Sequence, residues 1–119
     1  MAGTEIYIPE RGDLVWLTFN PDDGHDQSGR RPALVMSPQH YNQATGLALF
    51  CPITSQIKGY PFEVALPTGL RVPVVILADQ LRSLDWRARQ AVFIGQAPLA
   101  ALNEVLRKLD VLLKTSKPG

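Results

Sequence analysis

The sequence predicts a mainly β protein of the α+β class, in which a small open barrel of short strands is covered by a C-terminal helix. Two observations support this fold class. Apolar or alternating runs of strand length are separated by proline- and glycine-containing breaks along most of the chain. The tail instead places apolar residues at steps of three and four, which is the helical period.

The first strand is expected over residues 14–19, because aromatic and β-branched side chains favour extended backbone. Residues 20–24 (Asn-Pro-Asp-Asp-Gly) break this strand, and a polar loop continues to Gly29. The second strand is expected over residues 32–36, with Pro32 at its beginning, where a missing N–H is tolerated.

A short helix is expected after the second strand. Ser37 is the predicted N-cap, Pro38 suits the first turn, and Gly46 marks the end of the helix. The apolar run 47–53 then predicts a third strand. Its internal Pro52 indicates a bulge or an edge position near the end of that strand.

Three further strands and the closing helix complete the prediction. Residues 62–66 alternate as a half-exposed strand does, residues 72–78 form an apolar run, and residues 91–95 give a last short strand. Pro98 opens the helical tail. Its apolar stripe is expected to pack mainly in the core, with a part open to a partner, and consists of Leu99, Leu102, Val105, Leu106, Leu109, Leu112 and Leu113.

Length and composition predict a single domain over residues 1–119, with its core at about 7–113. Hydrophobic residues make up 45% of the chain and charged residues 19%, a balance that favours a packed core over disorder. No apolar run is long enough to span a bilayer, and residues 1–5 lack the features of a secretory signal. The single cysteine, Cys51, cannot form an internal disulfide, so we expect a buried thiol and a cytoplasmic location.

The formal net charge of +1 hides an asymmetry along the chain. Residues 1–29 carry six acids and one base, a balance of −5, whereas residues 30–119 carry eleven bases and five acids, a balance of +6. A basic face beside an acidic loop is therefore expected. This excess is smaller than that of a general nucleic-acid coat protein, so specific contact with a short nucleic acid stays open.

Several classes of catalytic site are not indicated by the sequence. The loop acids Asp22, Asp23 and Asp26 lack the spacing of a calcium-binding loop. His25 and His40 have no partner at the spacing of metal ligands. Neither a phosphate-binding glycine loop nor a Gly-x-Ser-x-Gly nucleophile motif is present in the sequence. Any catalysis is expected to use polar and charged side chains without a metal or cofactor.

RNA cleavage fits this restriction, because RNA carries its own nucleophile in the ribose 2′-hydroxyl. The protein then has to align that oxygen with the phosphorus, move protons and stabilise the added charge. Arg30 and Arg31 stand at a predicted strand entrance, and Thr54 stands at a strand exit. Arg31 suits the nonbridging phosphate oxygens, and Thr54 adds a neutral hydrogen-bond donor.

The order and spacing of several motifs resemble those of the MazF/PemK family of toxin endoribonucleases over about residues 7–113. The matching motifs are Pro9-x-x-Gly12-Asp13, Gln27-x-Gly29-x-Arg31-Pro32, Ser37-Pro38-x-x-Tyr41-Asn42, and residues 52–56, 58–64 and 78–89. The resemblance is greatest to the MazF branch. The PemK branch uses an arginine two positions before Asp79 as its general acid. That position is Leu77 here, so we do not expect that mechanism.

The resemblance implies an SH3-like open barrel with a short helix after the second strand, assembled as a homodimer. It implies sequence-specific, metal-independent cleavage of single-stranded RNA or mRNA, leaving 2′,3′-cyclic phosphate and 5′-hydroxyl ends. It further implies a cognate antitoxin whose tail occupies the RNA groove. The similarity through residues 58–64 suggests a short ACA-like target.

The resemblance also assigns site residues. Arg31 and Thr54 match the catalytic positions. Because arginine holds its proton tightly, a water or His25 is the candidate for proton transfer. The residues expected to bind RNA are Asp26, which stands where relatives often have glutamate, and Gln27, Arg30, Ser55, Gln56, Lys58, Asp79, Gln80 and Arg89.

Two alternatives stay open at this stage. Small SH3-like barrels often bind nucleic acid or a protein partner without chemistry, and some proteins of this barrel type bind a topoisomerase subunit. Trp16 and Trp86 are expected to be packing residues, although base stacking is a known use of tryptophan with single strands.

Overall fold

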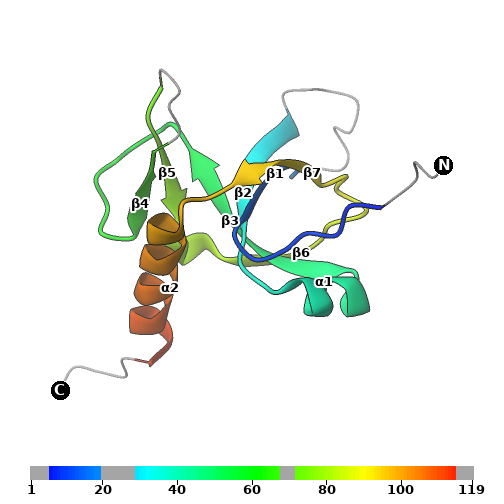
Figure 1. Ribbon diagram of the computed structural model, residues 1–119. Helices are drawn as coiled ribbons and strands as arrows, with labels where there is room; N and C mark the ends of the chain where they lie inside the picture. Colours follow the sequence, from blue (N-terminus) through cyan, green and yellow to red (C-terminus); the bar gives the residue numbers. More distant parts are fainter. Residues whose placement is uncertain (1–5, 20–28, 68–71, 115–119) are drawn as a thin grey trace.

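The structure is a computed structural model that describes residues 6–19, 29–67 and 72–114 (Figure 1). Within this part the strands are β1 (Asp13–Thr18), β2 (Arg30–Val35), β3 (Leu47–Thr54), β4 (Glu63–Leu66), β5 (Val74–Leu77), β6 (Arg82–Asp85) and β7 (Val92–Gln96). The helices are α1 (Gln39–Thr45), the short 3-10 helix η3 (Ala78–Gln80) and α2 (Leu99–Lys114).

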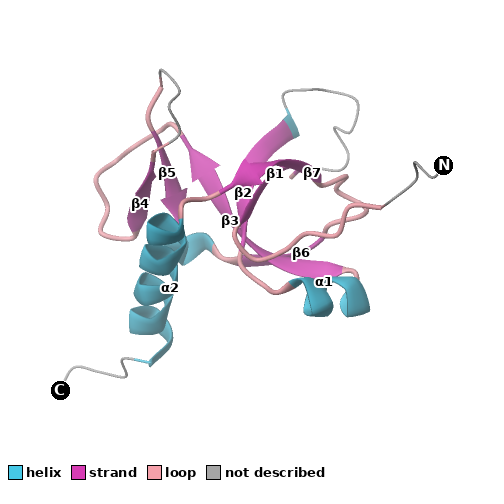
Figure 2. Ribbon diagram, in the orientation of Figure 1, coloured by secondary structure: helices cyan, strands magenta, loops and turns pink. Residues whose placement is uncertain are grey.

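The strands form one curled antiparallel sheet in the order β4-β5-β3-β2-β1-β7, and β6 pairs with β3. Figure 2 shows β3 crossing the middle of the molecule, with α2 against the β4–β5 part and α1 beside the curled part. This half-barrel with one helix after β2 and one at the C-terminal end confirms the predicted mainly β fold.

Pro52 marks the position at which β3 exchanges one neighbouring strand for another. Phe50 pairs with β2 on one side and with β6 on the other, whereas Ile53 pairs with Ile76 of β5. A proline has no N–H to donate to a ladder, so it is tolerated where the ladder is interrupted. Pro52 keeps its pairing with Ala33 of β2, so β3 shows a change of partner from β6 to β5 rather than the predicted bulge or edge position. Thr54 lies at the tip of β3, in the part that pairs with β5.

The sequence prediction missed β6 and placed part of η3 inside a strand. Only Leu84 is buried among the four residues of β6, so the sequence there has no alternating apolar pattern from which a strand could be predicted. Its extended form comes from pairing with β3. The expected strand over 72–78 is confined to Val74–Leu77, because the chain turns into η3 at Ala78.

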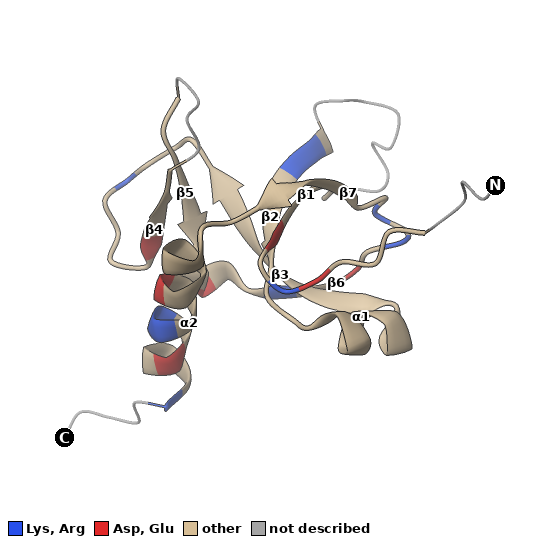
Figure 3. Ribbon diagram, in the orientation of Figure 1, with Lys and Arg blue, Asp and Glu red and all other residues tan. Residues whose placement is uncertain are grey.

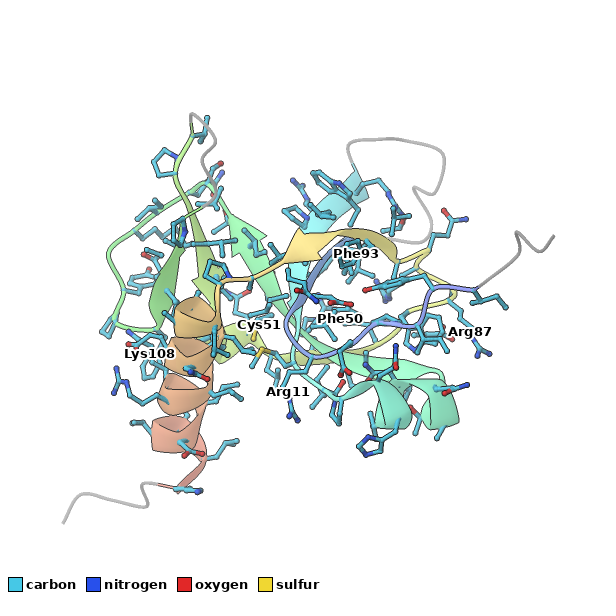
Figure 4. All side chains as sticks on the ribbon, viewed as in Figure 1. Arg11, Phe50, Cys51, Arg87, Phe93 and Lys108 are labelled. Carbon is cyan, nitrogen blue, oxygen red and sulfur yellow. The ribbon has the colours of Figure 1, made fainter. Side chains whose placement is uncertain are left out.

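Two apolar clusters fill the two sides of the sheet. One lies between the β3–β5 region and α2 and includes Cys51, Ile76 and Val105. The other fills the curl and includes Leu17, Phe50 and Trp86. Figure 4 shows Phe50 inside the curl and Cys51 toward α2. Cys51 is buried, as predicted, and its Sγ lies 3.8 Å from the carbonyl oxygen of Ala78.

The prediction of Ser37 as the N-cap of the first helix is wrong. The N-cap is Pro38, without a side-chain hydrogen bond. The Ser37 hydroxyl instead donates to Oδ1 of Asn42 at 2.6 Å and accepts from the backbone N–H of Leu49 at 2.8 Å. Ser37 therefore joins α1 to β3. The predicted end of the helix at Gly46 is confirmed, with a left-handed φ of 74°.

The apolar stripe of α2 is only partly core. Leu102 and Val105 are buried, but Leu99, Leu106 and Leu113 are exposed on the described surface. The core role is therefore confirmed for Leu102 and Val105, and the exposed leucines are the part of the stripe that a partner could contact. Among the described helices none is both long and apolar enough to cross a bilayer.

Candidate active site

A cleft of about 590 Å³ opens where the beginning of β2 lies near the end of β3. Its lining comes from the ends of several strands and from η3. The described lining residues are Trp16, Phe19, Arg30, Arg31, Pro32, Pro52, Ile53, Thr54, Ser55, Gln56, Val74, Gln80 and Arg82. Three of them are arginines and none is a carboxylate, so the described walls favour an anionic ligand.

Arg30 is held in place by hydrogen bonds within the protein. Its Nη1 donates to Oγ1 of Thr18 at 2.9 Å and to the carbonyl oxygen of Arg89 at 3.3 Å. Arg89 in turn donates from Nη1 to the carbonyl oxygens of Thr18, at 3.2 Å, and Phe19. The two arginines thereby fasten the end of β1 to the turn between β6 and β7.

Arg31 differs from its neighbour. Its side chain is exposed and makes no hydrogen bond or ion pair with another residue of the described part of the chain. Figure 3 shows the basic segment formed by Arg30 and Arg31 at the start of β2. Because backbone pairing with Leu17 fixes this segment, the guanidinium of Arg31 is presented to the cleft from a rigid strand.

Thr54 also lines the cleft, at the last position of β3. It pairs with Val75, and its Oγ1 accepts a hydrogen bond from the backbone N–H of Gln56 at 3.0 Å. This bond fixes the oxygen but leaves the hydroxyl proton available, because a threonine hydroxyl both accepts and donates. Arg31 and Thr54 therefore line one cleft, as two groups that act on the same phosphate must.

The predicted RNA-binding residues fall into two groups. Ser55, Gln56 and Gln80 line the cleft with Arg30. Lys58, Asp79 and Arg89 are not among its described lining residues. The RNA-binding role of both groups stays a prediction.

Lys58 and Asp79 have other described surroundings. The backbone N–H of Lys58 donates to Glu63, and its Nζ lies 5.9 Å from the ring centroid of Tyr60. Asp79 lies in η3, near Cys51. Burial, and then the carboxylate of Asp79, raises the pKa of the Cys51 thiol to about 12. His25, Asp26 and Gln27 lie outside the described residues.

Seven of the described lining residues had no catalytic or RNA-binding role in the sequence prediction, and three of them carry an aromatic or charged side chain. Trp16 is 42% exposed and lines the cleft, so its prediction as a packing residue is wrong. Phe19 and Arg82 also line the cleft, and the Arg82 guanidinium lies 5.7 Å from the ring centroid of Phe19. In the sequence, Arg82 was marked only by its place within the motif 78–89, and no neighbouring residue indicated that it lines a cleft.

No metal-binding group emerges from the described residues. Within 6–19, 29–67 and 72–114, no cluster of three His, Cys, Asp or Glu side chains is placed to hold a metal ion. The expectation of metal-independent chemistry stays a prediction.

Comparison with known sequences agrees with the motifs. A family model described as the PemK-like, MazF-like toxin of type II toxin–antitoxin systems matches residues 10–113. Endoribonuclease toxin MazF of Escherichia coli K12 is 47% identical over 107 residues, covering 90% of this chain and 96% of that protein. Endoribonuclease PemK of Escherichia coli is 34% identical over 108 residues, covering 87% and 81%.

Solved structures give the same result. The crystal structure of MazE-MazF (Form-II) from Deinococcus radiodurans has a TM-score of 0.81 and 53% identity, covering 93% of this chain and 100% of that chain. MazF (Form-I) from the same organism has a TM-score of 0.79 and 57% identity, covering 91% and 98%. The chain therefore belongs to the family of PemK-like and MazF-like toxins of type II toxin–antitoxin systems.

Proposed function

We propose that this protein is an endoribonuclease toxin that cuts single-stranded RNA at a short specific sequence without a metal ion. The observation that carries the proposal is the cleft that the exposed Arg31 and the Thr54 hydroxyl both line. The names of the relatives as endoribonucleases support the same activity.

The proposed reaction is an intramolecular displacement at phosphorus. The ribose 2′-oxygen forms a bond to the phosphorus, and the bond to the 5′-oxygen of the next nucleotide breaks. The 2′-hydroxyl proton passes to a water or to His25, and a water or the protonated His25 returns one proton to the leaving 5′-oxygen, so the net reaction moves one proton from the 2′-oxygen to the 5′-oxygen. The products are a 2′,3′-cyclic phosphate and a 5′-hydroxyl, so atoms and charge balance without another reactant.

Arg31 and Thr54 have distinct roles in this reaction. Arg31 binds the nonbridging phosphate oxygens with a charged fork, and Thr54 donates its hydroxyl proton to one of them. Both groups stabilise the additional negative charge that develops as the 2′-oxygen attacks. Their value comes from being held in position before the reaction, Arg31 by a strand and Thr54 by its bond to Gln56.

We further propose that a cognate antitoxin inhibits the protein by occupying the same groove. The solved MazE-MazF assemblies from Deinococcus radiodurans support a partner of this kind. The described cleft walls carry arginines and no carboxylate, which suits an acidic peptide segment as well as RNA. RNA and antitoxin are therefore expected to compete, and an RNA substrate is consistent with a cytoplasmic location.

A homodimer is the proposed assembly. Leu99, Leu106 and Leu113 recur at intervals of seven on α2 and are exposed, which leaves an apolar helix stripe available to a symmetric interface. Sedimentation at low micromolar concentration is expected to show a dimer, and Leu106→Glu is expected to shift it toward the monomer. A monomeric wild type would contradict this assembly.

The test of the function is cleavage of a mixed RNA pool in excess chelator, followed by mapping of both product ends. Wild type is expected to cut at one short sequence and to leave cyclic phosphate and 5′-hydroxyl ends. Arg31→Ala is expected to bind RNA and cut at least 100-fold more slowly, consistent with loss of an electrostatic stabiliser. Binding without any cut product would favour the non-catalytic alternative, and cleavage only with added divalent ions would refute metal independence.

A further inference from the structure

Arg82 is a cleft residue to which the proposed reaction assigns no role. It is the first residue of β6, and its backbone is fixed by pairing with the fully buried Phe50 of β3. Its guanidinium lies 5.7 Å from the ring centroid of Phe19, and both side chains line the cleft that holds Arg31 and Thr54. The sheet and the aromatic ring together restrict where this charge can lie.

The aromatic contact leaves the hydrogen-bonding edge of Arg82 unused. A cation–π contact is made with the face of the aromatic ring and does not occupy all five N–H donors of a guanidinium. Within the described part of the chain, Arg82 takes part in no ion pair or side-chain hydrogen bond. Arg30, in contrast, donates hydrogen bonds from Nη1 to Oγ1 of Thr18 and to the carbonyl oxygen of Arg89.

We propose that Arg82 binds a second phosphate of the RNA, next to the phosphate held by Arg31 and Thr54. This inference rests on the proposed function and identifies the part of the cleft that follows the RNA backbone. A polynucleotide entering a cleft with two available guanidinium groups places one phosphate at each. The contact exists in both the bound substrate and the transition state, so Arg82 acts in binding and in placing the strand.

The prediction separates Arg82 from Arg31 kinetically. Arg82→Ala is expected to raise KM about 5- to 10-fold and to leave kcat within about twofold, because a uniform binding interaction is lost. Arg31→Ala lowers kcat instead. Equilibrium binding is measured with an RNA oligonucleotide that carries the mapped cut site and a deoxyribose at the cut, which prevents cleavage during titration.

The dependence of binding on salt identifies the group that Arg82 contacts. Loss of one phosphate contact is expected to lower the magnitude of the slope of log K against log salt by about 0.7 for a single strand. Arg82→Lys keeps the charge, so it should retain most of that slope while losing part of the affinity. Thermal melting of each variant checks that the protein is folded.

Arg87 provides a matched control. Its guanidinium lies 4.8 Å from the ring of Trp86, and it lies outside the described cleft lining. Figure 4 places Arg87 at the right-hand edge of the view, beyond β6. Arg87→Ala removes the same charge and should leave the KM and the salt slope close to wild type.

The outcomes are distinguishable. A wild type that cuts RNA, together with an Arg82→Ala variant of unchanged KM and salt slope, would overturn the role of Arg82 and leave the proposed function standing. A changed cut sequence with an unchanged salt slope would also overturn it, because Arg82 would then read a base. A wild type that binds and cuts no RNA would overturn the proposed function itself.

Discussion

Arg30 donates a hydrogen bond of 2.9 Å to Oγ1 of Thr18, its direct partner across the β1–β2 ladder. Thr18 is buried, and its carbonyl oxygen accepts a hydrogen bond from Arg89. The first of two adjacent arginines is therefore part of the framework, while the second is open to the cleft. The ladder thus fixes the backbone of Arg31, while its guanidinium has no partner within residues 6–19, 29–67 and 72–114.

Removing the Thr18 hydroxyl should destabilise the fold. Thr18→Val keeps the shape and deletes the acceptor for Arg30, so we expect a loss of about 1.5 kcal/mol in the free energy of unfolding. Urea denaturation followed by tryptophan fluorescence measures it. Ser83→Ala, an exposed change in the neighbouring β6, should alter stability by less than about 0.5 kcal/mol. Equal stability of Thr18→Val and wild type would show that this bond does not hold the end of β1.

The Thr54 hydroxyl should matter for the chemical step. Thr54→Val removes the donor, and we expect kcat to fall about 100- to 1000-fold, as for loss of one preorganised donor. Thr54→Ser keeps the hydroxyl and should retain most of the activity. Single-turnover cleavage of a mapped RNA site measures both variants. Similar rates for Thr54→Val and wild type would remove Thr54 from the mechanism.

The Cys51 thiol should be unreactive in the native protein. Burial and the nearby Asp79 raise its pKa from the ordinary value near 9 to about 12, so almost no thiolate is present at pH 8. A chromogenic thiol reagent is expected to react slowly with native protein and at once after unfolding in guanidinium. Rapid native labelling at pH 8 would contradict the buried placement.

The same shift predicts a change of stability in alkali. A raised pKa means that the folded state holds the proton more tightly than the unfolded state. This contribution to stability is complete below about pH 9 and disappears as the pH rises toward 12. The Cys51→Ala variant has no thiol and therefore lacks this pH-dependent contribution. Its free energy of unfolding, measured by denaturant titration, should fall less steeply between pH 9 and 11 than that of wild type.

Glycine should be required at position 46 because of the left-handed backbone there, and not because a larger side chain would clash with its neighbours. Its φ is 74°, yet a Cβ at this position would meet nothing within 4 Å. Gly46→Ala should therefore lower the free energy of unfolding by about 1 kcal/mol, through left-handed backbone alone, and Gly46→Asn by less. Gly95→Ala is the control, because Gly95 also has open space and no left-handed φ. Equal effects at the two glycines would refute this explanation.

The sequence predicted those parts of the fold that depend on local chemistry. Gly46 ends a helix because glycine tolerates a left-handed backbone. Pro52 lies where β3 changes partner from β6 to β5, a place that suits a residue that cannot donate to a ladder. The β6 strand was missed because Arg82, Ser83 and Asp85 surround one buried leucine. Its strand state depends on pairing with β3, which no local pattern shows.

The main residues of the candidate site could be predicted from the sequence, but their individual contacts could not. The motifs located Arg31 and Thr54, which share the cleft, but adjacent arginines look alike in a sequence. Among the described residues, Arg30 differs from Arg31 by its hydrogen bonds to Thr18 and to the carbonyl oxygen of Arg89 and by its lower exposure. Likewise, the contact between Arg82 and Phe19 depends on folding, because it joins β6 to the residue after β1.

The most direct test of the central claim compares two RNA oligonucleotides that differ by a single oxygen. Both carry the mapped cut site, and one has deoxyribose in place of ribose on the 5′ side of the scissile phosphate. In excess chelator, wild type should cut the ribose oligonucleotide, leave the deoxyribose oligonucleotide intact, and bind both. Cleavage of the deoxyribose oligonucleotide at that phosphate would contradict attack by the 2′-hydroxyl within the Arg31–Thr54 cleft.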